Sequence, residues 1–211
     1  AGHKPMQVGP IGLRSFEIRA EKGPARVIGA IPHQIITKAL QLLPKIEEGN
    51  VVSDVDRDIL KMCVVERHKG TGNVGLGLVQ GFGLHCGALA TSVAHDSHNI
   101  AAVGVSDEEM LAAVLAVKQM GGGPVAVAGG KVQASLPLPV AGLLSEGYMR
   151  DVAEGIAECI DAAHELGCKL EDPFMTLSFL CLPVIPELKL TDRGLVDVRE
   201  FRLVEMFGEE G

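Results

Sequence analysis

Short runs of aliphatic and small residues, separated by turn signals, recur along the 211-residue chain and predict β-strands. Residues 124–128 and 131–136 flank Gly129-Gly130, a pair typical of a hairpin turn. Most of the chain is therefore expected to enter a mixed or antiparallel sheet. The other predicted strands cover residues 16–19, 26–31, 59–68, 88–93 and 100–105, an extended segment over 35–43, and pieces around 196–198 and 201–204.

The period of an amphipathic helix appears in two long stretches and one short one. Ser106 precedes the first and forms a capping box with Glu109, in which each side chain is expected to bond the other's backbone N–H; Gly121 ends this helix. The second is predicted over residues 148–166, where apolar residues form one stripe. A shorter helix is predicted over residues 172–182, because it begins with Asp-Pro.

These elements predict an α+β fold, in which a mixed or antiparallel sheet packs with two long helices and one short helix. The core is expected to be aliphatic, since aromatic residues make up 3% of the chain and Trp is absent. Residues 1–25 carry Gly, Pro and charge and are interpreted as a lead-in, from a tag remnant and the end of a preceding region. Residues 26–211 are interpreted as one domain. The chain starts without Met, which we interpret as a sign of processing, tagging or excision from a longer protein.

Glycine makes up 26 of the 211 residues, and seven of these glycines lie between residues 70 and 87. Aliphatic residues separate them, so the segment differs from a flexible linker and predicts closely packed backbone. We expect this packing to place residues 66–68 against residues 95–99. The G-x-G-x-x-G pattern at Gly70 does not open a helix and lacks a following Lys-Ser/Thr, so no phosphate loop is predicted.

Charge and composition exclude several classes of partner. The chain has 19 Lys and Arg against 27 Asp and Glu, for a net charge of −8, which disfavours nucleic acid and anionic membranes. No apolar run approaches the roughly 18 residues of a membrane-spanning helix. The five cysteines form no C-x-x-C pair and are expected to be buried, reduced thiols. Reduced thiols favour a cytoplasmic location.

Titratable side chains gather in two segments, residues 66–73 and 95–99, each at the end of a predicted strand. Because strand side chains alternate, Glu66 and His68 share one face, as do Asp96 and His98. Neighbouring strands are expected to bring one segment against the other. The candidate site residues are Glu66, His68, Asn73, His95, Asp96, Ser97, His98 and Asn99.

Three interpretations of this polar cluster stay open: a hydrogen-bonded network that holds loop ends, a wall of a substrate pocket completed by another domain, and a metal site. His95 and His98 face together only on a helix, which the local sequence disfavours. We therefore assign no metal ligand in this chain, and His95, Asp96 and His98 are the candidates if a metal binds. A stand-alone metal-binding hydrolase using Glu66, His68, Asp96 and His98 and an oligomerisation module are the alternative functions.

Several longer segments, taken together, are familiar. Residues 64–73, VVERHKGTGN, and 92–100, SVAHDSHNI, occur in order with LPLPVAGL at 136–143, DPFMTLSFL at 172–180 and residues 182–194. In this arrangement the chain resembles the C-terminal domain of adenine deaminase, of the amidohydrolase superfamily. The resemblance extends from roughly residue 11 to residue 207.

The resemblance implies hydrolysis of adenine to hypoxanthine and ammonia by a metal-bound hydroxide, with a divalent metal (Mn, Fe or Zn) held on a (β/α)₈ barrel. This chain lacks an H-x-H pair and is shorter than a barrel of about 250 residues. No catalytic or metal-ligating residue is therefore carried over to any position here. The resemblance implies a barrel domain as partner, adenine as substrate of the whole enzyme and a homo-oligomer, and the isolated chain is expected to be inactive.

Overall fold

The computed structural model describes residues 6–208, and within them the chain forms an α+β fold, as predicted. In chain order the elements are the 3₁₀ helix η1 (Leu13–Phe16), strands β1 (Ala25–Ala30), β2 (Thr37–Leu42), β3 (Lys45–Glu47), β4 (Asn50–Val52), β5 (Ile59–Val65), β6 (Val74–Gln80), β7 (Ala88–Thr91) and β8 (Ile100–Gly104), helix α1 (Asp107–Met120), strands β9 (Val125–Ala128) and β10 (Lys131–Ser135), helices α2 (Met149–Glu165) and α3 (Pro173–Phe179), and strands β11 (Leu188–Thr191), β12 (Gly194–Asp197) and β13 (Arg202–Val204).

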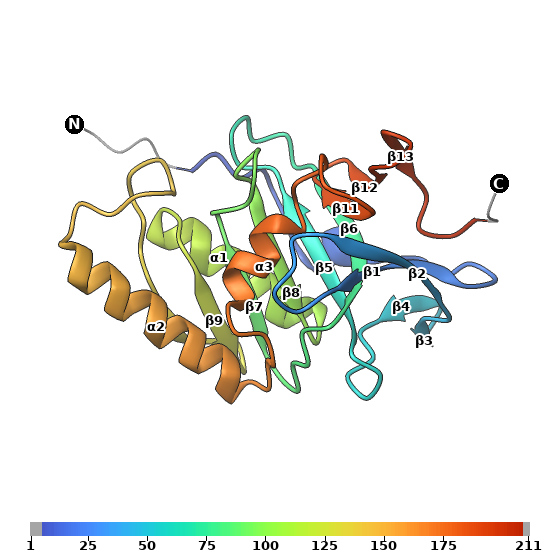
Figure 1. Cartoon of the computed structure of the whole chain (residues 1–211), viewed down its shortest axis with the longest axis horizontal. Helices are drawn as coiled ribbons and strands as arrows, with labels where there is room; N and C mark the ends of the chain where they lie inside the picture. The colour runs from blue at the N-terminus through green and yellow to red at the C-terminus, as the bar shows by residue number, and fades with distance from the viewer. Residues whose placement is uncertain (1–5, 209–211) are drawn as a thin grey trace.

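One mixed sheet of eight strands organises the molecule, in the order β10-β9-β7-β8-β5-β6-β1-β2 (Figure 1). All neighbours in it are antiparallel except β1 and β6, which are parallel. Strands β5 and β7 both pair antiparallel with β8, so they run in the same direction on either side of it. The ends of β5 and β7 and the start of β8 therefore meet at one edge of the sheet.

Both faces of the sheet are covered, which explains why every residue of β5 is buried. Leu60 and Met62 join the apolar cluster that includes residues of α2, α3, β11 and β12. Cys63 and Val65 point the other way, into a cluster with Met110 and other residues of α1. Figure 1 shows the same division, with α3 and β11 on one side of the sheet and α1 on the other.

Several sequence predictions fail at the ends of elements. Residues 13–16 form η1, so the strand predicted over 16–19 is wrong. The strand predicted over 59–68 ends at Val65, where the chain turns back around the Glu66 carboxylate. Helix α3 ends at Phe179 rather than Leu182. The β3–β4 hairpin and strands β6 and β11 were not predicted as strands.

The capping box at α1 is half formed. The Ser106 hydroxyl accepts from the Glu109 N–H at 3.3 Å, as predicted. The Glu109 carboxylate does not return to Ser106; it accepts from the N–H groups of Gly129 at 2.7 Å and Gly130 at 3.3 Å. Glu109 therefore ties the β9–β10 turn to the first turn of α1.

The glycine-rich segment is closely packed, as predicted, but against other neighbours than expected. A Cβ at Gly75 would lie 1.8 Å from the Thr191 carbonyl oxygen, and one at Gly87 would lie 2.1 Å from the Val127 oxygen. These approaches seat β11 on β6 and the turn before β7 on β9. The expectation that glycine packing places residues 66–68 against 95–99 is wrong, since side-chain and backbone hydrogen bonds join those segments instead.

Burial separates the five cysteines into two kinds. Burial raises the pKa of the Cys159 and Cys181 thiols to about 12 and that of Cys168 to about 11, and it raises the pKa of Cys63 as well. Cys86 is exposed, so the prediction of a buried thiol is wrong at that position. The residues around Cys86 in the sequence are mostly apolar, but Cys86 itself lies in an exposed bend before β7.

Two further sequence predictions concern the membrane and the lead-in. No helix within residues 6–208 is long and apolar enough to cross a membrane. Residues 1–5 of the predicted lead-in lie outside the described part. Within the remainder, Phe16 is fully buried and packs in the cluster that contains α1. The division after residue 25 stays a prediction.

Candidate polar site at the edge of the sheet

Glu66 organises the turn that follows β5. Its carboxylate accepts from the backbone N–H groups of His68 at 2.5 Å, Lys69 at 2.8 Å and Thr71 at 3.0 Å, and from the Thr71 hydroxyl at 3.0 Å. Burial alone would raise the pKa of Glu66, but these four hydrogen bonds outweigh it and lower the pKa to about 2. Both oxygens of Glu66 are therefore occupied in holding the loop.

Replacing Glu66 by Gln is expected to lower the free energy of unfolding by about 2 kcal/mol at neutral pH, because an amide NH₂ would face backbone N–H donors. The folded-state pKa lies below the ordinary 4.5, so the stabilisation is complete above about pH 4.5 and is lost as the pH falls towards 2. Urea unfolding of both chains from about pH 7 to pH 3 measures this. The exposed Glu21→Gln is the control, and a Glu66→Gln difference independent of pH would contradict the assignment.

Arg67, which is outside the set of candidate site residues, connects the two polar segments. Its side chain is buried, its Nε donates to the His98 carbonyl, and its Nη2 donates to the Ala141 carbonyl at 2.9 Å. Its backbone N–H donates to Asn99 Oδ1 at 3.4 Å. The predicted meeting of residues 66–68 with 95–99 is confirmed, and we call these two ranges the polar edge.

The two histidines of the second segment lie against each other and against α3. The rings of His95 and His98 are 5.6 Å apart, edge to face, and the His95 ring lies 4.9 Å from that of Phe179. The backbone N–H of His95 donates to Ser178 Oγ at 3.4 Å. Residues of α3 therefore form the support on which His95 rests.

His98 has an imidazole nitrogen without a partner. Its Nδ1 is buried and has no hydrogen bond to any of residues 6–208. Burial, and then the positive charges of His95 and Arg67, lower the pKa of His98, while Asp96 acts in the opposite direction. His98 is therefore a neutral imidazole at neutral pH.

The remaining candidates divide into those the structure brings together and one it does not. His68 Nε2 lies 2.7 Å from the Ser97 carbonyl oxygen, which joins the two segments a second time. Asp96 is exposed, and its carboxylate has no hydrogen bond within the described part of the chain. Asn73 points elsewhere, because its Nδ2 reaches Asp192 Oδ2, in the turn between β11 and β12, at 3.5 Å.

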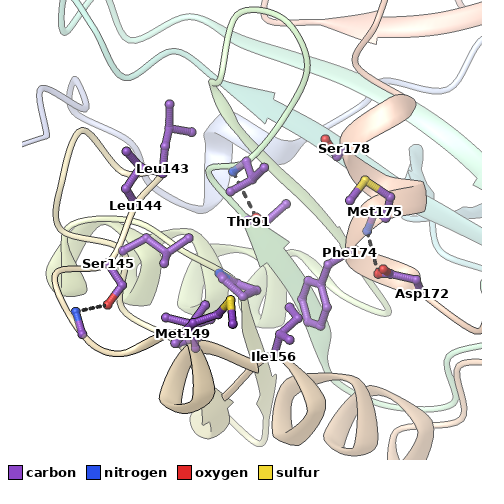
Figure 2. Close-up of a pocket in the computed structure, with 16 residues that line it drawn as sticks. Thr91, Leu143, Leu144, Ser145, Met149, Ile156, Asp172, Phe174, Met175 and Ser178 are labelled. Atoms are coloured by element: carbon purple, nitrogen blue, oxygen red, sulfur yellow. Dashed lines mark hydrogen bonds between the residues drawn. The ribbon is translucent and has the colours of Figure 1, made fainter. Parts of the chain in front are cut away.

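An apolar pocket of about 490 Å³ lies beside the polar edge. Figure 2 shows Leu143 and Leu144 on one side of it and Phe174 of α3 on the other. Ser178 lines this pocket and also accepts from the His95 N–H, so the pocket and the polar edge share α3 as a wall. The sequence carried no signal for this pocket, since its residues come from four separate stretches of the chain.

The side chains present do not by themselves fit a metal ion. No group of three His, Cys, Asp or Glu residues between residues 6 and 208 is arranged to hold one. Glu66 uses both oxygens on its own loop, and His68 uses Nε2 on the Ser97 carbonyl. The donor set of the alternative hydrolase, Glu66, His68, Asp96 and His98, is therefore not free as a set.

Comparison with known proteins places the chain in a family. Residues 34–202 match the model of the adenine deaminase C-terminal domain. The chain is 58% identical over 200 residues to adenine deaminase of Methanothrix thermoacetophila and 56% identical over 202 residues to that of Desulfatibacillum aliphaticivorans. These alignments cover 95% and 96% of this chain and 35% of each relative. The chain therefore belongs to the adenine deaminase C-terminal domain family and spans about a third of the length of these relatives.

Proposed function

We propose that this chain acts as the C-terminal domain of a complete adenine deaminase, which hydrolyses adenine to hypoxanthine and ammonia. One observation carries the proposal: an exposed Asp96 carboxylate and a His98 ring whose Nδ1 has no partner among residues 6–208 lie beside an apolar pocket. Polar groups that converge next to an apolar hollow are typical of a small-molecule site. The relatives, named adenine deaminase, are about three times as long, which leaves room for a further domain to complete such a site.

In the complete enzyme, the polar edge faces the mouth of an amidohydrolase-type barrel. His, Glu and Asp side chains of that barrel hold a divalent metal (Mn, Fe or Zn), which supplies a water of lowered pKa when bound. The part of this chain is binding and orientation. Asp96 and His98 hydrogen-bond the purine or the attacking water, and α3 keeps His95 in place beside them.

A cytoplasmic, homo-oligomeric enzyme completes the proposal. The five free cysteines support the location, because thiols stay reduced in the cytosol. Large apolar side chains at the start of α2 support an interface, since Tyr148 is 82% exposed and Met149 is 87% exposed. Solution mass of the complete enzyme measures the oligomeric state, and a monomer at all concentrations would contradict it.

Asp96→Ala and His98→Ala in the complete enzyme test the function of the polar edge. Each is expected to lower kcat/KM for adenine by about 10- to 100-fold, because each removes a group that orients substrate or water. The readout is ammonia release at a temperature below the Tm of every variant. The isolated 211-residue chain is expected to release no ammonia in this assay.

His85→Ala is the matched control, because His85 is an exposed histidine before β7, whereas the tested residues, Asp96 and His98, follow β7. Its kcat/KM is expected to equal that of the unmodified enzyme. If Asp96→Ala and His98→Ala also keep full kcat/KM and only lower the Tm, the polar edge is a structural network and the proposed function of this edge fails.

A further inference from the structure

Arg67 bonds to two carbonyl groups in unusual backbone conformations. The Nε acceptor is the carbonyl of His98, whose φ is +50°, and the Nη2 acceptor is the carbonyl of Ala141, whose φ is +57°. Residues other than glycine adopt this left-handed region rarely and hold it only where the surroundings enforce it. One side chain therefore stabilises two unfavourable turns, 74 positions away at Ala141 and 31 at His98.

The guanidinium has no anionic partner among residues 6–208. Arg67 is 7% exposed, and no carboxylate of the described residues lies within ion-pair distance of it. Burial lowers the pKa of Arg67, which reflects the cost of withdrawing its charge from water. A neutral side chain would fill the same space without this cost, so packing alone does not account for an arginine here.

The second turn that Arg67 holds belongs to the apolar pocket. Gly142 packs flat against the guanidinium, since a Cβ there would lie 2.9 Å from Arg67 Nη1. The Ser92 hydroxyl donates to the Gly142 carbonyl at 2.6 Å. The next residues, Leu143 and Leu144, line the pocket. Arg67 thus sits between the His95–His98 pair and the pocket wall.

We propose that Arg67 is the positioning residue of this site, and that its forked guanidinium sets the distance between residues 95–99 of the polar edge and the 140–144 turn. A planar fork with donors in fixed directions can hold two carbonyls at once, which a lysine ammonium does less well. The inference rests on the proposed function, because the spacing matters for activity only if the polar edge meets the substrate. Arg67 acts through His98 and the turn.

Arg67→Met and Arg67→Lys in the complete enzyme test this assignment. Arg67→Met is expected to lower kcat/KM for adenine about 100-fold, mostly in kcat, because small misplacement of orienting groups costs about that much. Arg67→Lys is expected to recover about 10-fold of the loss, since it restores the charge and one carbonyl bond. Gly142→Ala, which keeps Arg67 but crowds Nη1, is expected to lower kcat/KM about 10-fold.

Lys61→Met is the matched control, because Lys61 is a buried cation on β5, the strand that leads into Arg67, and its ion pair and hydrogen bond go to Asp107 and Phe16, outside the polar edge. It is expected to lower the Tm and leave kcat/KM unchanged below that temperature. Full kcat/KM in Arg67→Met and Gly142→Ala, with a loss in His98→Ala, overturns the role of Arg67 and leaves the proposed function standing. Full kcat/KM in all of these variants overturns both. If Lys61→Met loses as much kcat/KM as Arg67→Met, the effect of Arg67→Met is one of stability, and the positioning role of Arg67 is overturned.

Discussion

Replacing Lys61 by Met is expected to lower the free energy of unfolding of this chain by about 3 kcal/mol. The side chain of Lys61 is 2% exposed, its Nζ lies 2.6 Å from Asp107 Oδ1, and it donates to the Phe16 carbonyl at 2.5 Å. The variant leaves that carbonyl and that carboxylate without their cation. The Asp107 side chain is 25% exposed, and Asp107 is the first residue of α1, where the helix dipole favours a carboxylate. The expected loss is therefore at the lower end of the range for a broken buried ion pair.

Urea unfolding of Lys61→Met, Asp107→Asn and the double variant measures this pair. The sum of the two single losses in free energy of unfolding is expected to exceed the loss in the double variant, because each single change leaves the other partner buried without its counterion. Burial raises the pKa of Asp107 against the effect of Lys61, so removing Lys61 is expected to raise it further. A loss below about 1 kcal/mol in Lys61→Met would contradict a buried, coupled pair.

Replacing Gly75 by Ala is the second change with a large expected effect, also about 3 kcal/mol. The added Cβ would lie 1.8 Å from the Thr191 carbonyl oxygen, far inside van der Waals contact. Thr191 belongs to β11, which is paired with β12, so this oxygen cannot rotate away as the end of a side chain would. The strand pair must shift off the sheet to admit the methyl group.

Gly77→Ala is the matched control in the same strand and on the same face. There a Cβ would meet Leu190 Cδ2 at 3.3 Å, an atom at the flexible end of a side chain. Its expected loss is below about 1 kcal/mol. Equal losses in the two variants, measured by urea unfolding, would show that β11 does not press on Gly75.

These two results bear on the polar edge because β5 and β6 flank its first segment, while β7 and β8 flank the second. Lys61 lies on β5 and Gly75 lies on β6, and the loop that joins these strands holds Glu66. Stability changes at both positions are expected to leave kcat/KM unchanged in the complete enzyme below the Tm. They therefore serve as controls: a loss of kcat/KM in a His98 or Arg67 variant that these two variants do not show is a loss of function and not of stability.

Local sequence determined much of the secondary structure. The stop at Gly121 and the Ser106 cap bound α1 within one residue of the observed Asp107–Met120, and the apolar stripe bounds α2 equally well. The Gly129-Gly130 pair predicts the β9–β10 hairpin correctly. Periodicity, caps and turn residues are properties of neighbours in the chain, so they can be recognised without the fold.

The same local reasoning fails where a residue's partner is distant. Lys61 stands inside an otherwise apolar run, and its acceptors are Phe16 and Asp107. The Glu66 carboxylate binds backbone N–H groups of the following residues and ends the strand at Val65, so the predicted strand is three residues too long. Strand β11 was not predicted, because its pairing with β12 and its seat on Gly75 are tertiary contacts.

The sequence by itself determined the fold class, the two polar segments and their meeting at one edge, because strand alternation and the density of titratable groups are written in local order. Only the tertiary structure decided which side chains are free there. Backbone groups occupy Glu66 and His68, and Asn73 bonds to Asp192. The Asp96 carboxylate has no hydrogen bond to any of residues 6–208. Arg67 gains its role from carbonyls 31 and 74 residues away, and no period or motif records a contact closed over that distance.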